Sequence, residues 1–167
     1  CQPSDPAKAS DTLYKNNGDG TFENVSHLLG DMLRGAGFSA SFADYDNDGD
    51  LDIYVVNDMI VHPIGNVLWR NDGPGCGGWC WTDASNETGA GATRNSMGLA
   101  VGDYDNDLDL DFYFSDMGTA MSLLQNEGGQ FQNVSEVAGV GAEKELYGNI
   151  VGWGTAFFDY DNDGWLD

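Results

Sequence analysis

The chain has little positive charge. Only 6 of its 167 residues are Lys or Arg, against 28 Asp or Glu, and the formal net charge is −22. A protein this acidic lacks the basic surface that neutralises phosphates, so nucleic acid and anionic membrane surfaces are excluded as partners. The apolar stretches are also far shorter than the roughly 18 residues of a membrane-spanning helix, so we expect no membrane insertion.

Residue types that carry catalysis are scarce as well. The two histidines, His27 and His62, lie at unrelated places in the sequence pattern, and neither is spaced for work with a Ser or Cys nucleophile. Paired carboxylates can hydrolyse glycosides, but the carboxylates here are concentrated in runs that suit metal binding. We therefore predict that the protein is not an enzyme.

Cysteine is limited to three residues. Cys76 and Cys80 enclose a Gly-Gly-Trp segment, which predicts a small disulfide loop and an oxidising compartment. A second Cys pair that would complete a zinc site is missing. Cys1 is left over, and three interpretations stay open: a lipidated cysteine, an interchain disulfide partner or a free thiol.

Three copies of one nine-residue run dominate what is present. Each copy has Asp at positions one, three, five and nine. Calcium loops use side-chain oxygens at one, three and five, a backbone carbonyl at seven and a closing carboxylate. We therefore predict three Ca²⁺ sites. The predicted ligands are Asp44, Asp46, Asp48, Asp50 and Asp52; Asp103, Asp105, Asp107, Asp109 and Asp111; and Asp159, Asp161, Asp163, Trp165 and Asp167, with the position-seven residues acting through their carbonyls.

Charge repulsion favours a bound cation over a solvated acidic turn. Two like charges about 4 Å apart cost roughly 1 kcal/mol in water and about 4 kcal/mol at an intermediate dielectric. Gly49 and Gly164 occupy position six, where the loop turns and a positive φ is needed. The middle run has Leu108 there, so we expect the second site to be strained or weaker, but occupied at millimolar calcium.

An EF-hand is the other calcium loop that such runs can indicate. It requires Glu at position twelve and flanking helices. Position twelve is Val55 in the first run and Phe114 in the second, and the flanking segments are rich in β-branched and aromatic residues typical of strands. We therefore reject an EF-hand.

The segments around the acidic runs repeat too. The predicted first strands, before the runs, are 37–43, 96–102 and 152–158, and the second strands, after the runs, are 51–56 and 110–114. The third strands are 12–16, 67–71 and 122–126, and the fourth strands are 22–26, 81–85 and 131–135. Leu13, Leu68 and Leu123 are spaced 55 residues apart. Four short strands in a unit of this length, with Gly turns between the third and fourth, are typical of propeller blades.

We therefore expect an all-β fold, with residues 1–167 forming a single β-repeat array. The repeats span 13–67, 68–122 and 123–167, and the strands form four-stranded antiparallel blades, two complete with two half-blades. Two explanations of the half-blades stay open. The chain is part of a larger propeller, or copies associate head to tail so that residues 1–12 of a neighbour continue the incomplete third repeat.

Two segments carry a specific resemblance to a known family. Residues 42–54 (Phe-Ala-Asp-Tyr-Asp-Asn-Asp-Gly-Asp-Leu-Asp-Ile-Tyr) and 13–26 (Leu-Tyr-Lys-Asn-Asn-Gly-Asp-Gly-Thr-Phe-Glu-Asn-Val-Ser) resemble FG-GAP/VCBS-type repeats. The chain is most similar to secreted bacterial proteins of the cartilage-acidic-protein type, and it resembles integrin α-head blades. The resemblance covers nearly the whole chain. It implies a β-propeller, commonly seven-bladed, with Ca²⁺ in loops between strands and the Asp side chains named above as ligands; Leu108 departs from the pattern.

Three segments match the N-glycosylation acceptor pattern, at Asn24, Asn86 and Asn133. Asn24 and Asn133 also fall at one position of the repeat, where a strand residue is an equally good interpretation. Asn86 lies in a predicted loop and is the better acceptor.

Together these patterns predict an extracellular calcium-stabilised β-repeat protein with a structural or adhesive role, including that of a surface filament subunit. Its expected partners are other copies of itself or an extracellular protein or glycan. Two alternatives stay open: a ligand- or glycan-binding adhesin module of a seven-bladed propeller, or the non-catalytic propeller part of a polysaccharide-acting enzyme.

Overall fold

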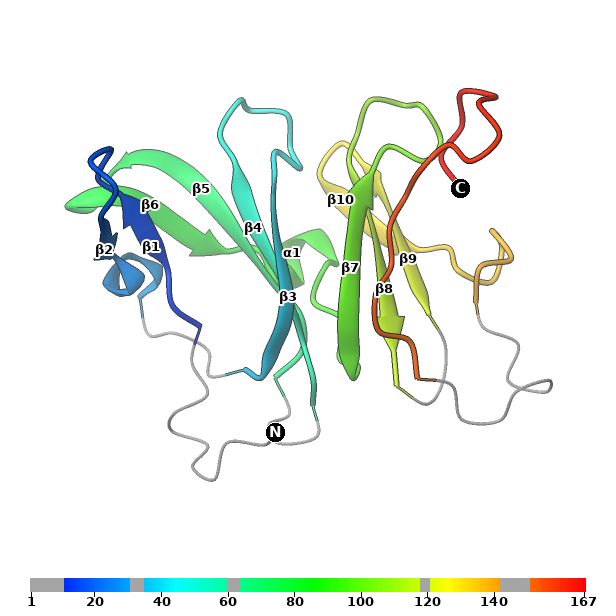
Figure 1. The fold of residues 1–167 in the computed structure, drawn as a ribbon, viewed down its shortest axis with the longest axis horizontal. Coiled ribbons are helices and arrows are strands. Elements are labelled where there is room, and N and C mark those ends of the chain that lie inside the picture. The colour runs from blue at the N-terminus through cyan, green and yellow to red at the C-terminus, as the bar shows by residue number, and fades with distance from the viewer. Residues whose placement is uncertain (1–10, 31–34, 60–63, 118–120, 142–150) are drawn as a thin grey trace.

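The computed structural model describes residues 11–30, 35–59, 64–117, 121–141 and 151–167. In that part of the chain the fold is all-β, which confirms the predicted class. Two four-stranded antiparallel sheets stand side by side, a two-stranded hairpin lies at one end and residues 151–167 lie at the other (Figure 1). The sheets have the form of propeller blades and do not close into a ring. Cys1 and His62 lie outside the described residues.

Each four-stranded sheet is built from consecutive strands. The first sheet has the order β3-β4-β5-β6 and the second β7-β8-β9-β10. The bounds in the first sheet are β3 Gly37–Ala43, β4 Asp52–Asn57, β5 Val67–Gly75 and β6 Gly78–Asp83. Those in the second are β7 Ser96–Gly102, β8 Asp111–Asp116, β9 Ser122–Glu127 and β10 Gln130–Asn133.

The register places each acidic run at the same corner of its sheet. Ala43 pairs with Asp52 across β3 and β4, and Gly102 pairs with Asp111 across β7 and β8. The run is therefore the connection between the first two strands of each sheet, as predicted. The second strands begin one residue later than expected, because the residue at position eight still belongs to the loop.

One predicted strand is wrong. Residues 152–158 form no strand, and the extended segment has a single bridge, from Val151 to Met117. A strand needs a ladder of partners, and among the described residues nothing pairs with 152–158 in the way that β4 pairs with β3. At the mouth of the acidic run, Phe158 and Asp167 donate backbone N–H groups to each other's carbonyls at 3.3 and 3.1 Å.

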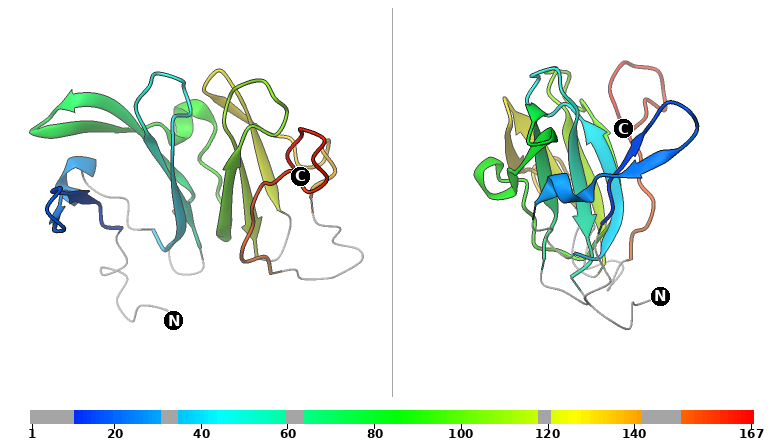
Figure 2. Two further views of the ribbon diagram at one scale, coloured as in Figure 1. Left: turned by 45° about the horizontal axis from the view of Figure 1, so that its top comes forward. Right: turned by 90° about the vertical axis from the view of Figure 1, so that its left-hand side faces the viewer.

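The two-stranded hairpin consists of β1 Tyr14–Asn16 and β2 Phe22–Asn24, followed by a 3₁₀ turn, η2 Ser26–Leu29, that contains His27. A short helix, α1 Ser85–Thr88, follows β6 in the same way. The hairpin corresponds to the third and fourth strands of a blade, as predicted, and the views in Figure 2 show it beside the outer strands of the first sheet.

A repeated serine fixes the end of each outer strand. The hydroxyls of Ser26, Ser85 and Ser135 accept the backbone N–H of Leu13, Leu68 and Leu123 at 3.0, 2.9 and 2.8 Å. Each serine N–H in turn donates to the side-chain oxygen two residues before it, on Asn24, Asp83 or Asn133. The amide side chains of Asn24 and Asn133 therefore have a role in the turn. Glycosylation at Asn24, Asn86 and Asn133 stays a prediction.

The main core lies between the two sheets. Tyr54 of β4 stacks on Phe112 of β8 with centroids 4.3 Å apart, and Phe112 stacks on Phe131 of β10 at 4.8 Å. Val56, Leu68, Phe114 and Leu124 belong to the same buried cluster. Aromatic pairs of this kind add about 0.5–1.5 kcal/mol each beyond the area they bury. The sheets are therefore held face to face as successive blades.

The predicted disulfide between Cys76 and Cys80 is present. It closes the turn between β5 and β6, which extends further than the other sheet's corresponding turn. Trp79 is exposed at this tip.

Candidate metal centres

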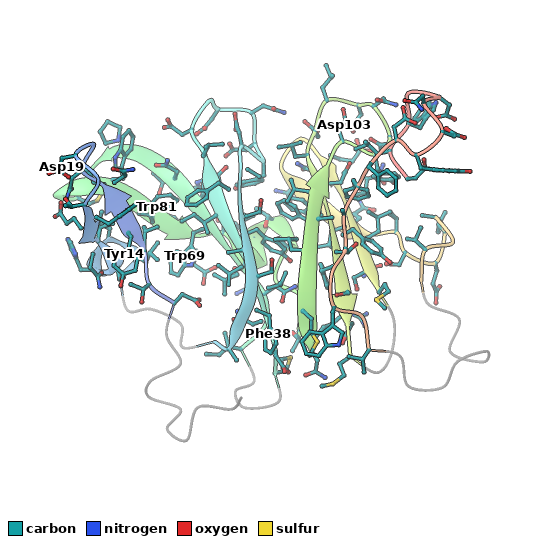
Figure 3. The ribbon with its side chains drawn as sticks, viewed as in Figure 1. Tyr14, Asp19, Phe38, Trp69, Trp81 and Asp103 are labelled. Atoms are coloured by element: carbon teal, nitrogen blue, oxygen red, sulfur yellow. A yellow bond between two sulfur atoms is a disulfide. The ribbon has the colours of Figure 1, made fainter. Side chains whose placement is uncertain are left out.

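The three acidic runs lie along one edge of the molecule. We name them loop one (44–52), loop two (103–111) and loop three (159–167). They project beyond the same ends of the sheets, in cyan, green and red (Figure 1), and Asp103 of loop two marks this edge in Figure 3. Successive loops are therefore neighbours in space although they are more than 50 residues apart in sequence.

All three loops have one backbone conformation, set by the carboxylate at position one. Asp44 accepts the N–H groups of Asp48 and Gly49 at 3.1 and 3.0 Å. Asp103 accepts those of Asp107 and Leu108 at 3.1 and 3.0 Å. Asp159 accepts those of Asp163 and Gly164 at 3.1 and 2.9 Å. The repeated sequence thus folds each loop locally, before any contact with the rest of its sheet is counted.

Position six takes a left-handed conformation in all three loops. The φ angles are 94° at Gly49, 78° at Leu108 and 91° at Gly164. This region costs a residue with a side chain roughly 1–2 kcal/mol. The strain expected in loop two is therefore present, and the Leu108 side chain is 81% exposed, so packing does not compensate for it.

The loops gather carboxylates at metal-binding distances. In loops one and two the clusters are formed by positions one, three and five: Asp44, Asp46 and Asp48, and Asp103, Asp105 and Asp107. In loop three the cluster is Asp159, Asp161 and Asp167. In each cluster the candidate ligand atoms lie within 4.8 Å of one another. The side chains of Asp50, Asp109 and Asp163 are outside these clusters, as are Asp52 and Asp111.

Two oxygens in these clusters are left without a partner. Oδ1 of Asp46 and Oδ1 of Asp105 are buried and accept no hydrogen bond from any described residue. A buried carboxylate oxygen without a donor is costly. Because these oxygens stand beside two further carboxylates, a cation would compensate their charge. The residues therefore fit a hard cation that prefers oxygen ligands.

The closing carboxylates of loops one and two have a structural role. Asp52 accepts the N–H of Tyr45 at 3.2 Å and that of Asn71 at 2.8 Å. Asp111 accepts the N–H of Tyr104 at 3.1 Å and that of Asn126 at 2.8 Å. Both side chains are at most 1% exposed. They link the loop to the third strand, and their role as metal ligands stays a prediction.

Burial and neighbouring charge shift the acidity of these groups. Burial raises the pKa of Asp52 and of Asp111 to about 6, and the carboxylates at positions three and five add to the rise. Burial also raises the pKa of Asp46, with Asp48 and Asp44 contributing and Arg70 acting against them. The charged form of these carboxylates is thus disfavoured in the protein. A bound cation would favour the charged form and lower their pKa values.

Side chains from the third strands also reach the loops, and the sequence analysis missed them. Gln125 of β9 donates from Nε2 to Oδ2 of Asp105 at 2.6 Å. Its counterpart Arg70 lies near Asp46 and is held by Asp72 and Glu87, each at 2.8 Å. Arg70 and Gln125 are each followed by an asparagine, Asn71 and Asn126, that recurs in the repeat. This recurrence is visible in the sequence, but it does not show which loop Arg70 and Gln125 contact.

The comparison with known families agrees with the local pattern. Residues 5–55 match the model of the FG-GAP-like repeat, a span that includes β3, loop one and most of β4. No curated protein matches the chain. Among the described residues, no helix has the length and apolar character needed to cross a bilayer. The match supports a propeller-type repeat for the first part of the chain.

Proposed function

We propose that the loops bind Ca²⁺ and that the protein is an extracellular, calcium-stabilised structural or adhesive repeat protein without catalytic activity. The observation that carries the proposal is the pair of buried, unpartnered oxygens of Asp46 and Asp105 within clusters of three carboxylates. In this account Asp44, Asp46, Asp48 and Asp52 hold one ion, with their counterparts in loops two and three holding two more. The carbonyls of Asp50, Asp109 and Trp165 complete the sets.

The ion supplies positive charge at a point where three elements meet. Loop one joins β3 to β4, and Asp52 joins its end to Asn71 of β5. Loop two is connected to β9 in the same way through Asn126. Neutralising the carboxylates therefore stabilises the corner of each sheet, which couples metal binding to folding.

An extracellular location agrees with two independent features. Calcium modules outside cells typically bind with dissociation constants of about 10⁻⁴–10⁻³ M, which suits millimolar calcium. The Cys76–Cys80 disulfide persists in oxidising compartments.

Calorimetric titration of the metal-free protein with CaCl₂ tests the proposal. We expect binding of up to three ions, with MgCl₂ binding much more weakly because Mg²⁺ requires a tighter octahedral site. Asp46→Asn and Asp105→Asn should each remove one binding event. Asp72→Asn, a substitution outside the three loops, should remove none. Absence of calcium binding at millimolar concentration would refute the proposal.

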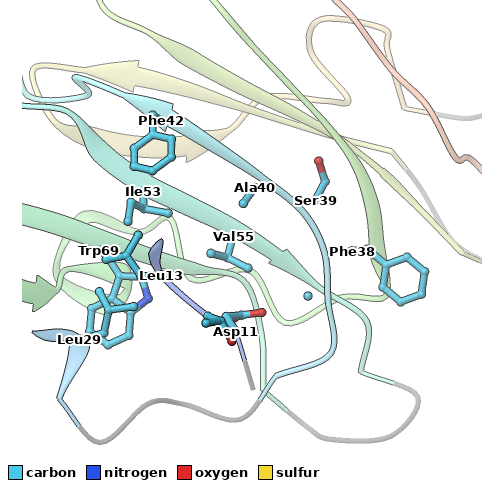
Figure 4. Close-up of a pocket in the computed structure, with 12 residues that line it drawn as sticks. Asp11, Leu13, Leu29, Phe38, Ser39, Ala40, Phe42, Ile53, Val55 and Trp69 are labelled. Atoms are coloured by element: carbon cyan, nitrogen blue, oxygen red, sulfur yellow. The ribbon is translucent and has the colours of Figure 1, made fainter. Parts of the chain in front are cut away.

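A second candidate function, head-to-tail assembly into a filament, is favoured by two open faces. On one side Phe42 is exposed beside a cavity of about 330 Å³ lined by Leu13, Ile53, Val55 and Trp69 (Figure 4). The corresponding face of the second sheet is covered by the first. On the other side Phe158 is exposed. Neighbouring copies would cover both faces. Light scattering in calcium tests this candidate, and particles of the size of one chain would show that it is wrong.

A further inference from the structure

Neighbouring acidic loops are joined through the asparagine at position four. Nδ2 of Asn47, at the exposed tip of loop one, donates to Oδ1 of Asp109 in loop two at 2.7 Å. Asn106, at the same position of loop two, donates to the carbonyl of Gly164 in loop three at 3.4 Å. One repeat position therefore makes the contact at both successive junctions, so the loops form a connected row.

Asp109 is fixed from two sides. Besides the bond from Asn47, its Oδ2 accepts the N–H of Gly128, in the turn between β9 and β10, at 2.6 Å. Asp109 also occupies position seven, whose backbone carbonyl is a predicted ligand. Ordering loop two therefore also positions Oδ1 of Asp109, the oxygen that accepts the hydrogen bond from Asn47.

A buried connection runs in parallel. The N–H of Asn126 donates to Oδ1 of Asp111, the closing carboxylate of loop two, at 2.8 Å. Its Nδ2 donates to the carbonyl of Tyr45, in loop one, at 2.7 Å. Gly129 lies so close to loop one that a Cβ there would meet Cβ of Asp46 at 3.5 Å. The two loops thus share Asn126 as a hydrogen-bond partner.

We propose that calcium binding in loops one and two is positively cooperative, with Asn47 as a positioning residue that carries part of the coupling. This inference rests on the proposed function. Binding in loop two orders Asp109, so loop one loses less conformational freedom when it binds in turn. Linkage requires loop one to strengthen loop two by the same factor. A charge-assisted hydrogen bond of this kind supports a coupling of about threefold to tenfold.

The coupling can be measured at one loop by nuclear magnetic resonance. The assigned amide of Gly49 reports loop one; loop two has Leu108 at that position, and Gly164 of loop three gives a separately assigned resonance. Loop two is disabled with Asp107→Ala or, should that variant not fold, with Asp105→Asn. Asn47→Gly removes the donor and tolerates the φ of 59° at this residue. The Gly49 resonance is titrated with CaCl₂ in the wild type, in each single variant and in the double variant.

We expect disabling loop two to weaken loop one about threefold to tenfold in the wild type, and by less than half that factor when Asn47 is Gly. Asn162→Gly, at position four of loop three, is the matched control and should leave the affinity of loop one unchanged. A Gly49 affinity that is indifferent to loop two, or a coupling factor that is unchanged by Asn47→Gly, overturns the inference alone. A Gly49 resonance that never responds to calcium overturns the proposed function as well.

Discussion

Loops two and three have the same local hydrogen bonds in different surroundings. In loop two the closing residue Asp111 is fully buried and binds the N–H of Asn126 on β9. In loop three Asp167 is exposed, and its side chain accepts the local N–H of Tyr160, at 3.1 Å. The difference shows that nine residues suffice to shape the loop, whereas burying its last carboxylate requires the second and third strands.

The junctions beside these loops differ in the same sense. Between the two sheets, Tyr54, Phe112 and Phe131 form a continuous buried stack. Between the second sheet and residues 151–158, Phe157 meets Tyr113 at 6.2 Å in a tilted pair, and Trp153 is 64% exposed. The third loop is thus attached to the molecule by a weaker junction than the one that joins the first two.

The largest expected effect breaks the stronger junction. Phe112→Ala removes the central ring of the stack and leaves a cavity between the sheets, so we expect a loss of about 3–5 kcal/mol in the free energy of unfolding. Phe157→Ala, at the weaker junction, should cost about 1 kcal/mol, because its ring is only partly buried. Urea denaturation of both variants measures the difference, and equal losses would show that the junctions are equivalent.

The next comparison removes the closing carboxylate from each kind of loop, in chelator so that metal binding does not contribute. Asp111→Ala leaves the N–H groups of Tyr104 and Asn126 without their acceptor, which should cost about 3 kcal/mol. Asp167→Ala should change stability by about 0.5 kcal/mol or less, as is usual at an exposed position. The same denaturation assay applies. A large effect of Asp167→Ala would contradict the distinction between buried and exposed closing residues.

Much of this arrangement could be predicted from the sequence. The alternating strands, the Gly turns and the three acidic runs follow rules of local composition, and the Cys76–Cys80 pair follows from its spacing. The failure at 152–158 has a physical cause: its composition is that of a strand, but a strand forms only with partners, and composition does not supply them. The bond from Asn126 to Tyr45 depends on how the two sheets pack, and the bond from Gln125 to Asp105 depends on how the third strand lies against its own loop; no local pattern specifies either.

A smaller effect concerns the strain in loop two. Leu108→Gly removes a side chain from a residue with φ of 78°, so we expect a gain of about 1 kcal/mol in stability, partly offset by the greater freedom of glycine in the unfolded chain. The reverse change in loop one, Gly49→Leu, should cost about 1–2 kcal/mol. Thermal denaturation in calcium measures both. Loss of stability in Leu108→Gly would mean that the Leu108 side chain makes a contribution that its exposure does not reveal.

The melting temperature with and without calcium tests the central claim most directly. At calcium concentrations about a hundredfold above the dissociation constant, each site adds about 2.7 kcal/mol. Two such sites should raise the melting temperature by about 10 °C or more in a protein of this size. We predict this rise on moving from excess chelator to 10 mM CaCl₂, a concentration about a hundredfold above a dissociation constant of about 10⁻⁴ M. An unchanged melting temperature would contradict the account, because carboxylates this close would then be stable in the folded protein without a cation.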